Sequence, residues 1–358
     1  MQKRITSTLL VAGMCIGGGT IAIPMVLAKI GIIPSAIITI LVWFLNYYPS
    51  LIGMDLNLRS ERGLSLGTLG KIFSGRGAQI AGELSVKILS YAALTMYLCG
   101  SSSIIQKLLE VYFQYEIPIV AIESVIAAAG VILLFFPFKA ISYINNIMFV
   151  GFIVIFTVLL GTMLKFTDYS NMPWIVQPTF KDVLSVCPVI FASFGYQLIL
   201  HTLRDYNGRN AESIKKSIFT GSFMPALVYI VWTATSLNVI LNSNPEFFSQ
   251  LVTGKIEIGE FVKELATISS LSNFQVLVWW MSILAILTSY VGVGIGLAES
   301  MNMTLEPIVK KCVPMRKILA AVATIGPAYI VAVIDPNAFI KILGFVGAMV
   351  ATIGILVP

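Results

Sequence analysis

Three consecutive glycines stand in the middle of an apolar segment and could bind a charged ligand inside a membrane. They are Gly17, Gly18 and Gly19, in the segment 5–28. A helix that breaks there leaves N–H and C=O groups without partners, which is costly in hydrocarbon unless the break lines a cavity or meets a ligand. The amides that begin the second half-helix, near Thr20, carry the positive end of a helix dipole and suit a carboxylate.

The carbonyls that end the first half-helix suit an ammonium group. They belong to Met14, Cys15 and Ile16. The two sides of the break together fit the backbone of an amino acid. The alternative interpretation is close helix packing, for which small residues are common in membranes.

A second interruption of the same kind lies half a chain away. Ser193, Phe194 and Gly195 interrupt the segment 183–203, and Gln197 follows them. Interrupted segments at corresponding positions of two halves are typical of inverted-repeat secondary transporters, which bind their substrate near the bilayer midplane. The pair of interruptions therefore favours a binding site over close packing. The predicted substrate-binding residues are Ile16, Gly17, Gly18, Gly19, Thr20, Tyr91, Ser193, Phe194, Gly195 and Gln197.

The composition predicts an all-α polytopic membrane protein in contact with lipid. Hydrophobic residues make up 57% of the chain and charged residues 11%, and the mean hydropathy is +0.91. A span needs about 20 apolar residues. Ten segments meet this requirement, and we expect them to form one transmembrane domain over 1–358, with repeats at about 5–164 and 183–357. The ten segments are 5–28, 32–56, 78–105, 117–138, 141–164, 183–203, 217–241, 273–298, 316–334 and 337–357.

Enzymes and metal proteins are excluded by what the sequence lacks. It has one His, no HExxH and no GxSxG. The four cysteines lack CxxC spacing, so we expect no disulfide, metal or cofactor; they are Cys15, Cys99, Cys187 and Cys312. The net charge of +6 does not indicate nucleic acid, because Lys and Arg orient the spans instead. Most of them fall on the side of the N-terminus, which predicts that this end is cytoplasmic. No feature specifies an oligomeric state.

A polar stripe follows the third apolar segment at intervals of four residues. Its members are Glu83, Lys87, Tyr91, Thr95 and Cys99. Such a stripe in a membrane normally faces a cavity. Lys87 is expected near mid-membrane, where Glu83 one turn earlier could neutralise it as a structural pair. Alternatively, Lys87 titrates or replaces a coupling cation during transport.

Several other residues have an ordinary interpretation beside a functional one. Tyr91 and Phe194 could flank the side chain of a substrate or belong to an aromatic core. The carboxyl groups of Glu123, Asp55 and Glu299 could carry protons, but acids near the ends of spans are more often solvated or paired.

The connection 242–271 contains an amphipathic pattern. Ile258, Phe261, Val262, Leu265 and Ala266 share one helical face. This helix could be a lid over a binding site or could lie passively on the membrane surface.

Four stretches in order resemble bacterial aromatic amino acid permeases, the tyrosine- and tryptophan-specific group of the amino acid-polyamine-organocation superfamily. The stretches are 11–24 (VAGMCIGGGTIAIP), 63–69 (GLSLGTL), 188–195 (PVIFASFG) and 287–293 (LTSYVGV). The resemblance extends from Ile5 to Val357. It implies a leucine-transporter-like five-plus-five inverted repeat with broken helices 1 and 6, and symport of tyrosine or tryptophan across the inner membrane, driven by protons rather than sodium.

The resemblance also implies roles and departures at particular residues. Thr288 and Ser289 resemble the hydroxyl pair that holds sodium in sodium-coupled relatives, and they could be a remnant in a proton carrier. Gln197 stands where relatives commonly have His, and His201 comes one turn later. Family members usually have an eleventh helix, which this sequence lacks up to Pro358. The alternatives are a sodium-coupled carrier of other neutral amino acids, and a channel or receptor on the same fold.

Overall fold

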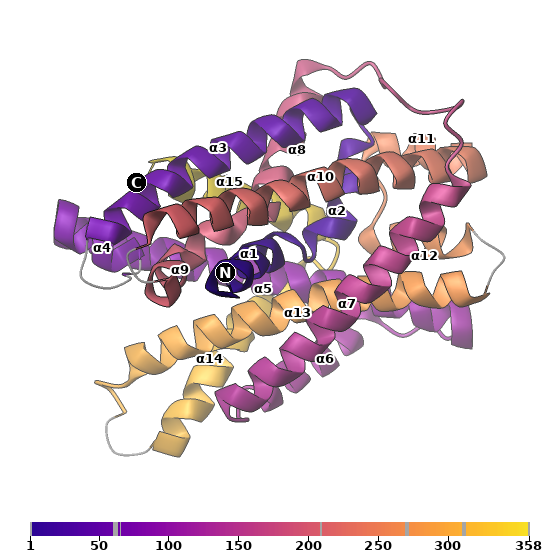
Figure 1. The fold of residues 1–358 in the computed structure, drawn as a ribbon. Helices are drawn as coiled ribbons and strands as arrows, with labels where there is room; N and C mark the ends of the chain where they lie inside the picture. The colour runs from indigo at the N-terminus through magenta and orange to yellow at the C-terminus, as the bar shows by residue number, and fades with distance from the viewer. Residues whose placement is uncertain are drawn as a thin grey trace. The chain divides into compact units, whose positions relative to one another are not determined.

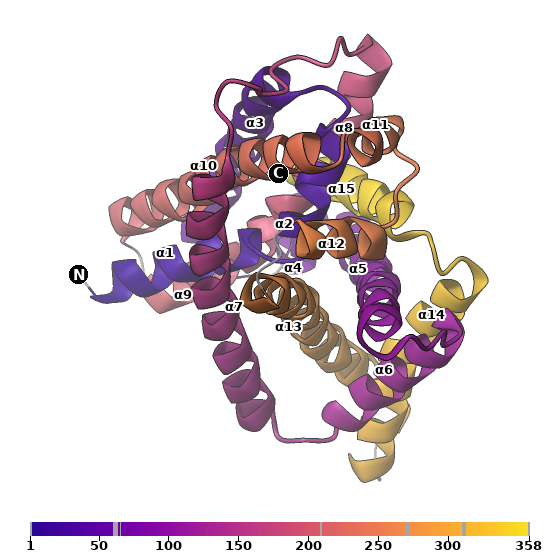
Figure 2. The same cartoon turned by 90° about the vertical axis from the view of Figure 1, so that its right-hand side faces the viewer.

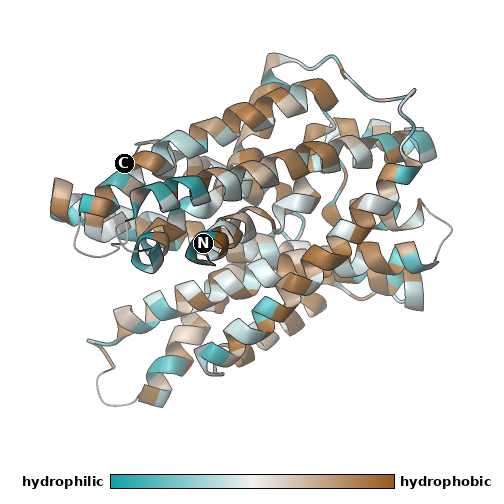
Figure 3. Cartoon of the chain, viewed as in Figure 1, coloured by the Kyte–Doolittle hydropathy of each residue, from teal (hydrophilic) through white to brown (hydrophobic). Residues whose placement is uncertain are grey.

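Helices account for all the regular structure in the part of the chain that the structure describes. The structure is a computed structural model, and it describes residues 2–59, 64, 66–207, 210–268, 272–309 and 313–356. The predicted motif residues Gly63 and Ser65, Cys312 and the segment end at Val357 lie outside this part. Hydrophobic residues extend along most of the helices, as expected for a protein that contacts lipid (Figure 3).

Seven helical segments are long and apolar enough to cross a membrane, or eight if the bent pair α1 and α2 forms one span. Two of the ten predicted spans, 117–138 and 337–357, correspond to the shorter apolar helices α6 and α15. The structure therefore confirms an all-helical multi-pass membrane protein, with seven to eight helices of full membrane length among the described residues.

The chain forms two compact units, and each is built from several separate parts of the sequence. The first unit contains Met1–Leu89, Tyr169–Asn238 and Gly344–Pro358. Its helices are α1 (Gln2–Cys15), α2 (Gly19–Leu27), α3 (Ile32–Arg59), α4 (Leu66–Ser74), α8 (Phe180–Ser193), the 3-10 helix η1 (Gly195–Ile199), α9 (Leu200–Asn207) and most of α10 (Ala211–Ser243) (Figure 1). It also holds the beginning of α5 (Arg76–Phe113) and most of α15 (Phe339–Leu356).

The second unit contains Ser90–Asp168 and Val239–Leu343. Its helices are the rest of α5, α6 (Ile119–Leu133), α7 (Phe138–Phe166), α11 (Pro245–Thr253), α12 (Ile258–Thr267), α13 (Ser272–Leu305) and α14 (Val313–Ile334). Within it α13 packs against α7 and α14, and α14 also packs against α6 (Figure 2). Each unit thus combines segments from both predicted repeats.

Two prolines inside helices free carbonyl groups that another helix then satisfies. Proline has no N–H, so the carbonyl four residues earlier loses its helical partner. Pro24 frees the carbonyl of Thr20, which accepts a hydrogen bond from Nε1 of Trp232 at 2.6 Å. In the second unit Pro327 frees the carbonyl of Ala323, which accepts from the hydroxyl of Tyr91 at 2.6 Å.

The last three residues of the predicted polar stripe, Tyr91, Thr95 and Cys99, contact backbone carbonyls of α14 and of the residue after it. The expectation that the stripe faces a cavity is therefore wrong for these three residues. Besides Tyr91, the hydroxyl of Thr95 donates to the carbonyl of Ala328 at 3.3 Å, and the thiol of Cys99 donates to the carbonyl of Asp335 at 3.8 Å. These three groups hold α5 against α14 and the residue after it, and of the three carbonyls only that of Ala323 is freed by Pro327.

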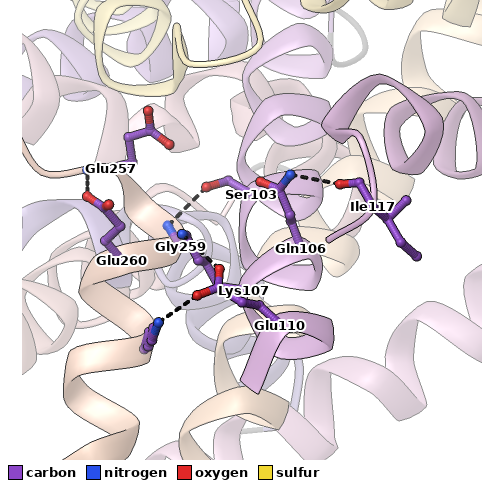
Figure 4. A network of polar contacts seen from close by, with 9 residues as sticks. Ser103, Gln106, Lys107, Glu110, Ile117, Glu257, Gly259 and Glu260 are labelled. Carbon is purple, nitrogen blue, oxygen red and sulfur yellow. Dashed lines mark hydrogen bonds and ion pairs between the residues drawn. The ribbon is translucent and has the colours of Figure 1, made fainter. Parts of the chain in front are cut away.

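The predicted amphipathic helix is present as α12. Its buried residues are Ile258, Gly259, Phe261, Val262, Leu265 and Ala266, which include every residue of the predicted apolar face. It packs against the end of α5, where the amide of Gly259 donates to Oγ of Ser103 at 3.1 Å (Figure 4). Nearby, Lys263 and Lys107 pair with Glu110 at 2.8 and 3.0 Å.

Candidate binding site at the two helix interruptions

The first helix breaks at the predicted glycines. α1 ends at Cys15, α2 begins at Gly19, and their axes differ by 52°. The last turn of α1 closes through the bond from the amide of Ile16 to the carbonyl of Ala12, at 2.8 Å. The first hydrogen bond of α2 closes a 3-10 turn, from the amide of Thr20 to the carbonyl of Gly17 three residues earlier, at 2.9 Å. The local sequence explains the bend, since glycine stabilises a helix poorly.

The break leaves donors without acceptors. The amides of Gly17, Gly18 and Gly19 donate to no acceptor among the described residues. The side chain of Thr20 is fully buried, and its hydroxyl has no hydrogen-bond partner in this part of the chain. Gly18 and Thr20 are buried, and buried donors usually have a partner in the functional protein. Four donors at the N-terminus of a helix suit the oxygens of a carboxylate.

The acceptor side of the break is partly occupied by the protein itself. The hydroxyl of Tyr229 donates to the carbonyl of Cys15. Of the three predicted partners for an ammonium group, Cys15 therefore already has a donor, and Met14 and Ile16 are the other two. Tyr229 lies on α10 and is fully buried. Its position at the break means that α10, which the sequence analysis did not include, helps to form the site.

At the second interruption the chain changes from an α-helix to a 3-10 helix and does not bend sharply away. α8 ends at Ser193, Phe194 has a φ of −112° and a ψ of 35°, and the chain continues as the 3-10 helix η1 before α9. The 3-10 form often marks a hinge or a strained stretch inside a longer helix. Gly195 and Gln197 both belong to η1, so these two predicted residues lie on the irregular turn.

The two interruptions meet within the first unit. A Cβ placed on Gly19 would stand 3.0 Å from Cβ of Ser193 and 3.4 Å from the hydroxyl oxygen of Tyr229. The Ser193 hydroxyl donates back to the carbonyl of Val189 at 3.1 Å. Glycine at position 19 therefore allows the backbones of α2 and α8 to approach closely, as the packing interpretation predicts, while the neighbouring amides still lack acceptors. The packing interpretation applies to Gly19, and the binding interpretation of the neighbouring amides stays a prediction.

The ring of Phe194 packs against that of Tyr229 on α10. Phe194 is fully buried, and its ring meets that of Tyr229 edge-on, with centroids 6.0 Å apart and planes at 82°. Tyr91 belongs to the second unit, where it binds the carbonyl of Ala323. Trp232 lies one turn from Tyr229 on α10. Sequence reasoning missed both α10 aromatics, because aromatic residues in an apolar helix look like ordinary core.

Beyond η1 lies a cavity of about 280 Å³. Gln197 lines it together with His201, Ser50 and Asn57. Gln197 donates through Nε2 to the carbonyl of Asn46 at 3.3 Å. A volume close to the lower end of the range for ligand pockets suits a single amino acid. Of the predicted substrate-binding residues, Gln197 is the one that reaches this cavity.

Tyr196, beside Gln197, is fully buried, and its hydroxyl is 3.0 Å from that of Ser50. This contact attaches η1 to α3. Because Ser50 also lines the cavity, this hydrogen bond connects η1 to the wall of the cavity.

The predicted ion-coupling residues occupy different units. Lys87 is half-buried on α5 in the first unit. Glu83, its expected partner, is exposed and accepts a bond from Gln79 at 3.0 Å. Thr288 and Ser289 lie on α13 in the second unit, and their hydroxyls donate to carbonyls of their own helix at 2.8 and 3.1 Å.

The three minor acidic candidates have different surroundings. Asp55 is exposed and pairs with Arg59 at 2.8 Å, which is the ordinary solvated arrangement. Glu299 lines a second cavity, of about 260 Å³, together with Lys317. Glu123 is completely buried.

Comparison with known proteins gives a consistent result over the whole length. Residues 1–358 match the model of the tryptophan/tyrosine permease family. The chain is 27% identical to the tyrosine-specific transport system 1 of Haemophilus influenzae, with 100% of this chain and 87% of that protein covered. It is 24% identical to the tryptophan-specific transport protein of Pseudomonas aeruginosa, with 98% and 84% covered.

A relative with a different substrate also matches. The chain is 22% identical to glutamine transporter 2 of Aliivibrio fischeri, with 99% of this chain and 87% of that protein covered. These relatives are transport proteins rather than enzymes. The family match over the full sequence, together with the interrupted helices and the membrane-length segments, shows that this chain belongs to the tryptophan/tyrosine permease family.

Proposed function

We propose that this protein imports tyrosine or tryptophan across the bacterial inner membrane by alternating access, with a cytoplasmic N-terminus. The observation that carries the proposal is the break between α1 and α2. The amides of Gly17, Gly18 and Gly19 and the hydroxyl of Thr20 have no acceptor among the described residues. A substrate carboxylate supplies the missing acceptor, at the positive end of α2.

The ammonium group and the side chain of the substrate have their own partners. The carbonyls of Met14 and Ile16 end the first half-helix and accept from the ammonium group. The aromatic residues Phe194 and Tyr229 lie at the same break, and offset or edge-on ring contacts are worth about 0.5–1.5 kcal/mol each beyond the buried area. Two aromatic side chains beside the carboxylate site favour an aromatic substrate over an aliphatic one.

The composition of the two units agrees with an inverted repeat of five plus five spans. The first unit takes spans one and two from the first half and the corresponding spans six and seven from the second. The second unit takes most of span three with its counterpart span eight, and span four with its counterpart span nine. Equivalent contributions of this kind are expected when two halves have the same fold. The fifth pair differs, because span five belongs to the second unit and most of span ten to the first. The excess of Lys and Arg on the side of the N-terminus supports the proposed orientation.

A carrier of other neutral amino acids is the second candidate function. A glutamine transporter is among the relatives, and Gln197 and Asn46 bring amide groups close to the cavity. Sodium would be the coupling ion in that case, with Thr288 and Ser289 as its hydroxyl ligands.

Uptake into proteoliposomes tests both candidates. Labelled tyrosine, tryptophan, leucine and glutamine are offered separately, with a proton gradient alone or a sodium gradient alone. The proposal expects saturable uptake of tyrosine or tryptophan, counterflow, and accumulation with the proton gradient. Uptake of glutamine with sodium supports the second candidate. Flux without saturation or counterflow contradicts a carrier and indicates a channel.

A matched pair of variants connects uptake to the break. Thr20→Val removes the hydroxyl that lacks a partner and keeps the branched shape. Thr162→Val removes a hydroxyl on α7 that binds its own helix at 2.8 Å and serves as the control. We expect weaker substrate binding only for Thr20→Val, by roughly 10- to 150-fold, because one hydrogen bond to a charged group is worth about 1.5–3 kcal/mol.

A further inference from the structure

A carboxyl group in the second unit is buried and has no hydrogen-bond partner in the part of the chain that the structure describes. Glu123, on α6, has a side chain with 0% exposure. Both of its carboxyl oxygens lack a partner among the described residues. Glu123 is the fifth residue of α6, beyond the first turn where free amides could bind an acidic side chain. Buried polar side chains nearly always have partners, so this one requires an explanation.

No ion pair of Glu123 is found among the described residues around it. Helix α6 packs against α14, meets α5 near Cys99, and meets α13 through Tyr290 beside Gly130. The titratable and charged groups on these elements in the second unit are Tyr91, Tyr97, Cys99, Lys107, Glu110 and Tyr112 on α5, Tyr290 and Glu299 on α13, Arg316, Lys317 and Tyr329 on α14, and Asp335 directly after it. The thiol of Cys99 lies within electrostatic range of the carboxyl groups of Glu123 and Asp335.

Two lysines of the second unit are paired with other carboxylates. Lys341 binds Asp335 at 3.0 Å, and Lys107 binds Glu110 at 3.0 Å. The neighbouring hydroxyl of Tyr329 lies 2.7 Å from that of Ser124. An ionised carboxylate buried without a cation or a donor is very unfavourable, and a group in this position neutralises by taking up a proton.

We infer that Glu123 is the site at which this protein binds the proton that it transports with its substrate. The inference rests on the proposed function and names its coupling ion. In the conformation described here the carboxyl group is closed off from water and holds the proton. Release requires another conformation, in which Glu123 reaches water and the proton passes to it. A ligand, here the proton, shifts an equilibrium between two conformations only if its affinity differs between them. A carboxyl group binds a proton more tightly when it is buried than when it is hydrated, and this provides the difference.

Proton-driven accumulation by a Glu123→Gln variant tests the inference. Gln keeps the size and neutrality of the protonated side chain and cannot release a proton. One coupled proton supports roughly 10-fold accumulation for a gradient of about one pH unit. We expect accumulation to fall to the level without a gradient, while counterflow, which needs no net proton movement, continues. Glu116→Gln, an exposed acid just before α6, is the control and keeps normal accumulation.

Infrared spectroscopy of the wild-type protein in nanodiscs provides a readout that does not depend on transport. We expect a band of a buried protonated carboxyl group that changes position in Glu123→Asp and is absent from Glu123→Gln. If that band is missing from the wild type, or if Glu123→Gln still accumulates substrate with a proton gradient, the inference is overturned. If the wild type transports neither tyrosine nor tryptophan but has the band, the proposed substrate is wrong and the protonation site stands.

Discussion

Gly19→Ala is the sharpest test of the close contact between the two interrupted helices. The added Cβ would stand 3.0 Å from Cβ of Ser193 and would overlap its hydroxyl even more closely. Real Cβ atoms are rarely found this near to another side chain. We therefore expect α2 and α8 to separate at the site, which moves the amides of Gly17 and Gly18 away from the proposed position of the substrate carboxylate.

The size of the effect follows from the packing. Adding a methyl group to a well-packed core costs about 1–3 kcal/mol. If all of this cost affects substrate binding, affinity falls roughly 5- to 150-fold, because about 1.4 kcal/mol is tenfold. Ser193→Gly removes both atoms that the new Cβ meets first. The double variant Gly19→Ala, Ser193→Gly should therefore recover most of the loss, which separates a steric effect from a general loss of stability.

Binding of labelled tyrosine to purified protein, together with uptake, measures the effect. Gly161→Ala is the matched control, since a Cβ at Gly161 has nothing within 4 Å. It should bind and transport like the wild type. Wild-type affinity in Gly19→Ala, or a double variant that is no better than the single one, would refute the reasoning about the contact.

Three further predictions concern other contacts. Tyr229→Phe removes the hydrogen bond to the carbonyl of Cys15 and should lower stability by about 0.5–1.5 kcal/mol in thermal unfolding; unchanged unfolding would contradict a structural role for that bond. Lys263→Met removes an ion pair with Glu110, so the opening free energy of α12 measured by hydrogen exchange should fall by about 0.2–1 kcal/mol, and Lys263→Arg, which keeps the charge, should change it less. Burial, and then the neighbouring Glu260, raise the pKa of Glu257 above its ordinary range, so the folded form holds this proton more tightly. The packing of α12 should therefore weaken as pH rises from the ordinary pKa range of a glutamate through the raised pKa, and hydrogen exchange in α12 should become faster. In Glu257→Gln this dependence of hydrogen exchange on packing should no longer change with pH.

Elements determined by local chemistry could be predicted from the sequence. The break at Gly17 and Gly18 was predictable because glycine weakens a helix wherever it stands. The face of α12 was predictable from apolar residues at helical spacing. Helix α11 was not predicted, although Asn244 caps its first turn and Pro245 occupies its first position, a pattern typical of helix starts.

Contacts between distant segments could not be predicted in this way. Tyr91 was predicted at the binding site from its place on a polar stripe, but Pro327 frees a carbonyl of another helix that Tyr91 binds. Tyr229 and Trp232 were overlooked at the site, because only the fold places them beside residues far away in the sequence. Periodicity indicates which face of a helix is polar, but it does not indicate which helix that face meets.

The bond between Trp232 and the carbonyl of Thr20 also affects how the protein is made. The two residues are 212 positions apart, so the ribosome completes α2 long before its partner exists. Until α10 enters the bilayer, the carbonyl that Pro24 leaves open has no helical donor. We expect α2 to mature late during biogenesis, and nascent chains that stop before residue 232 to expose this region to quality-control proteases. The position of one proline thereby makes the first membrane segment depend on the seventh.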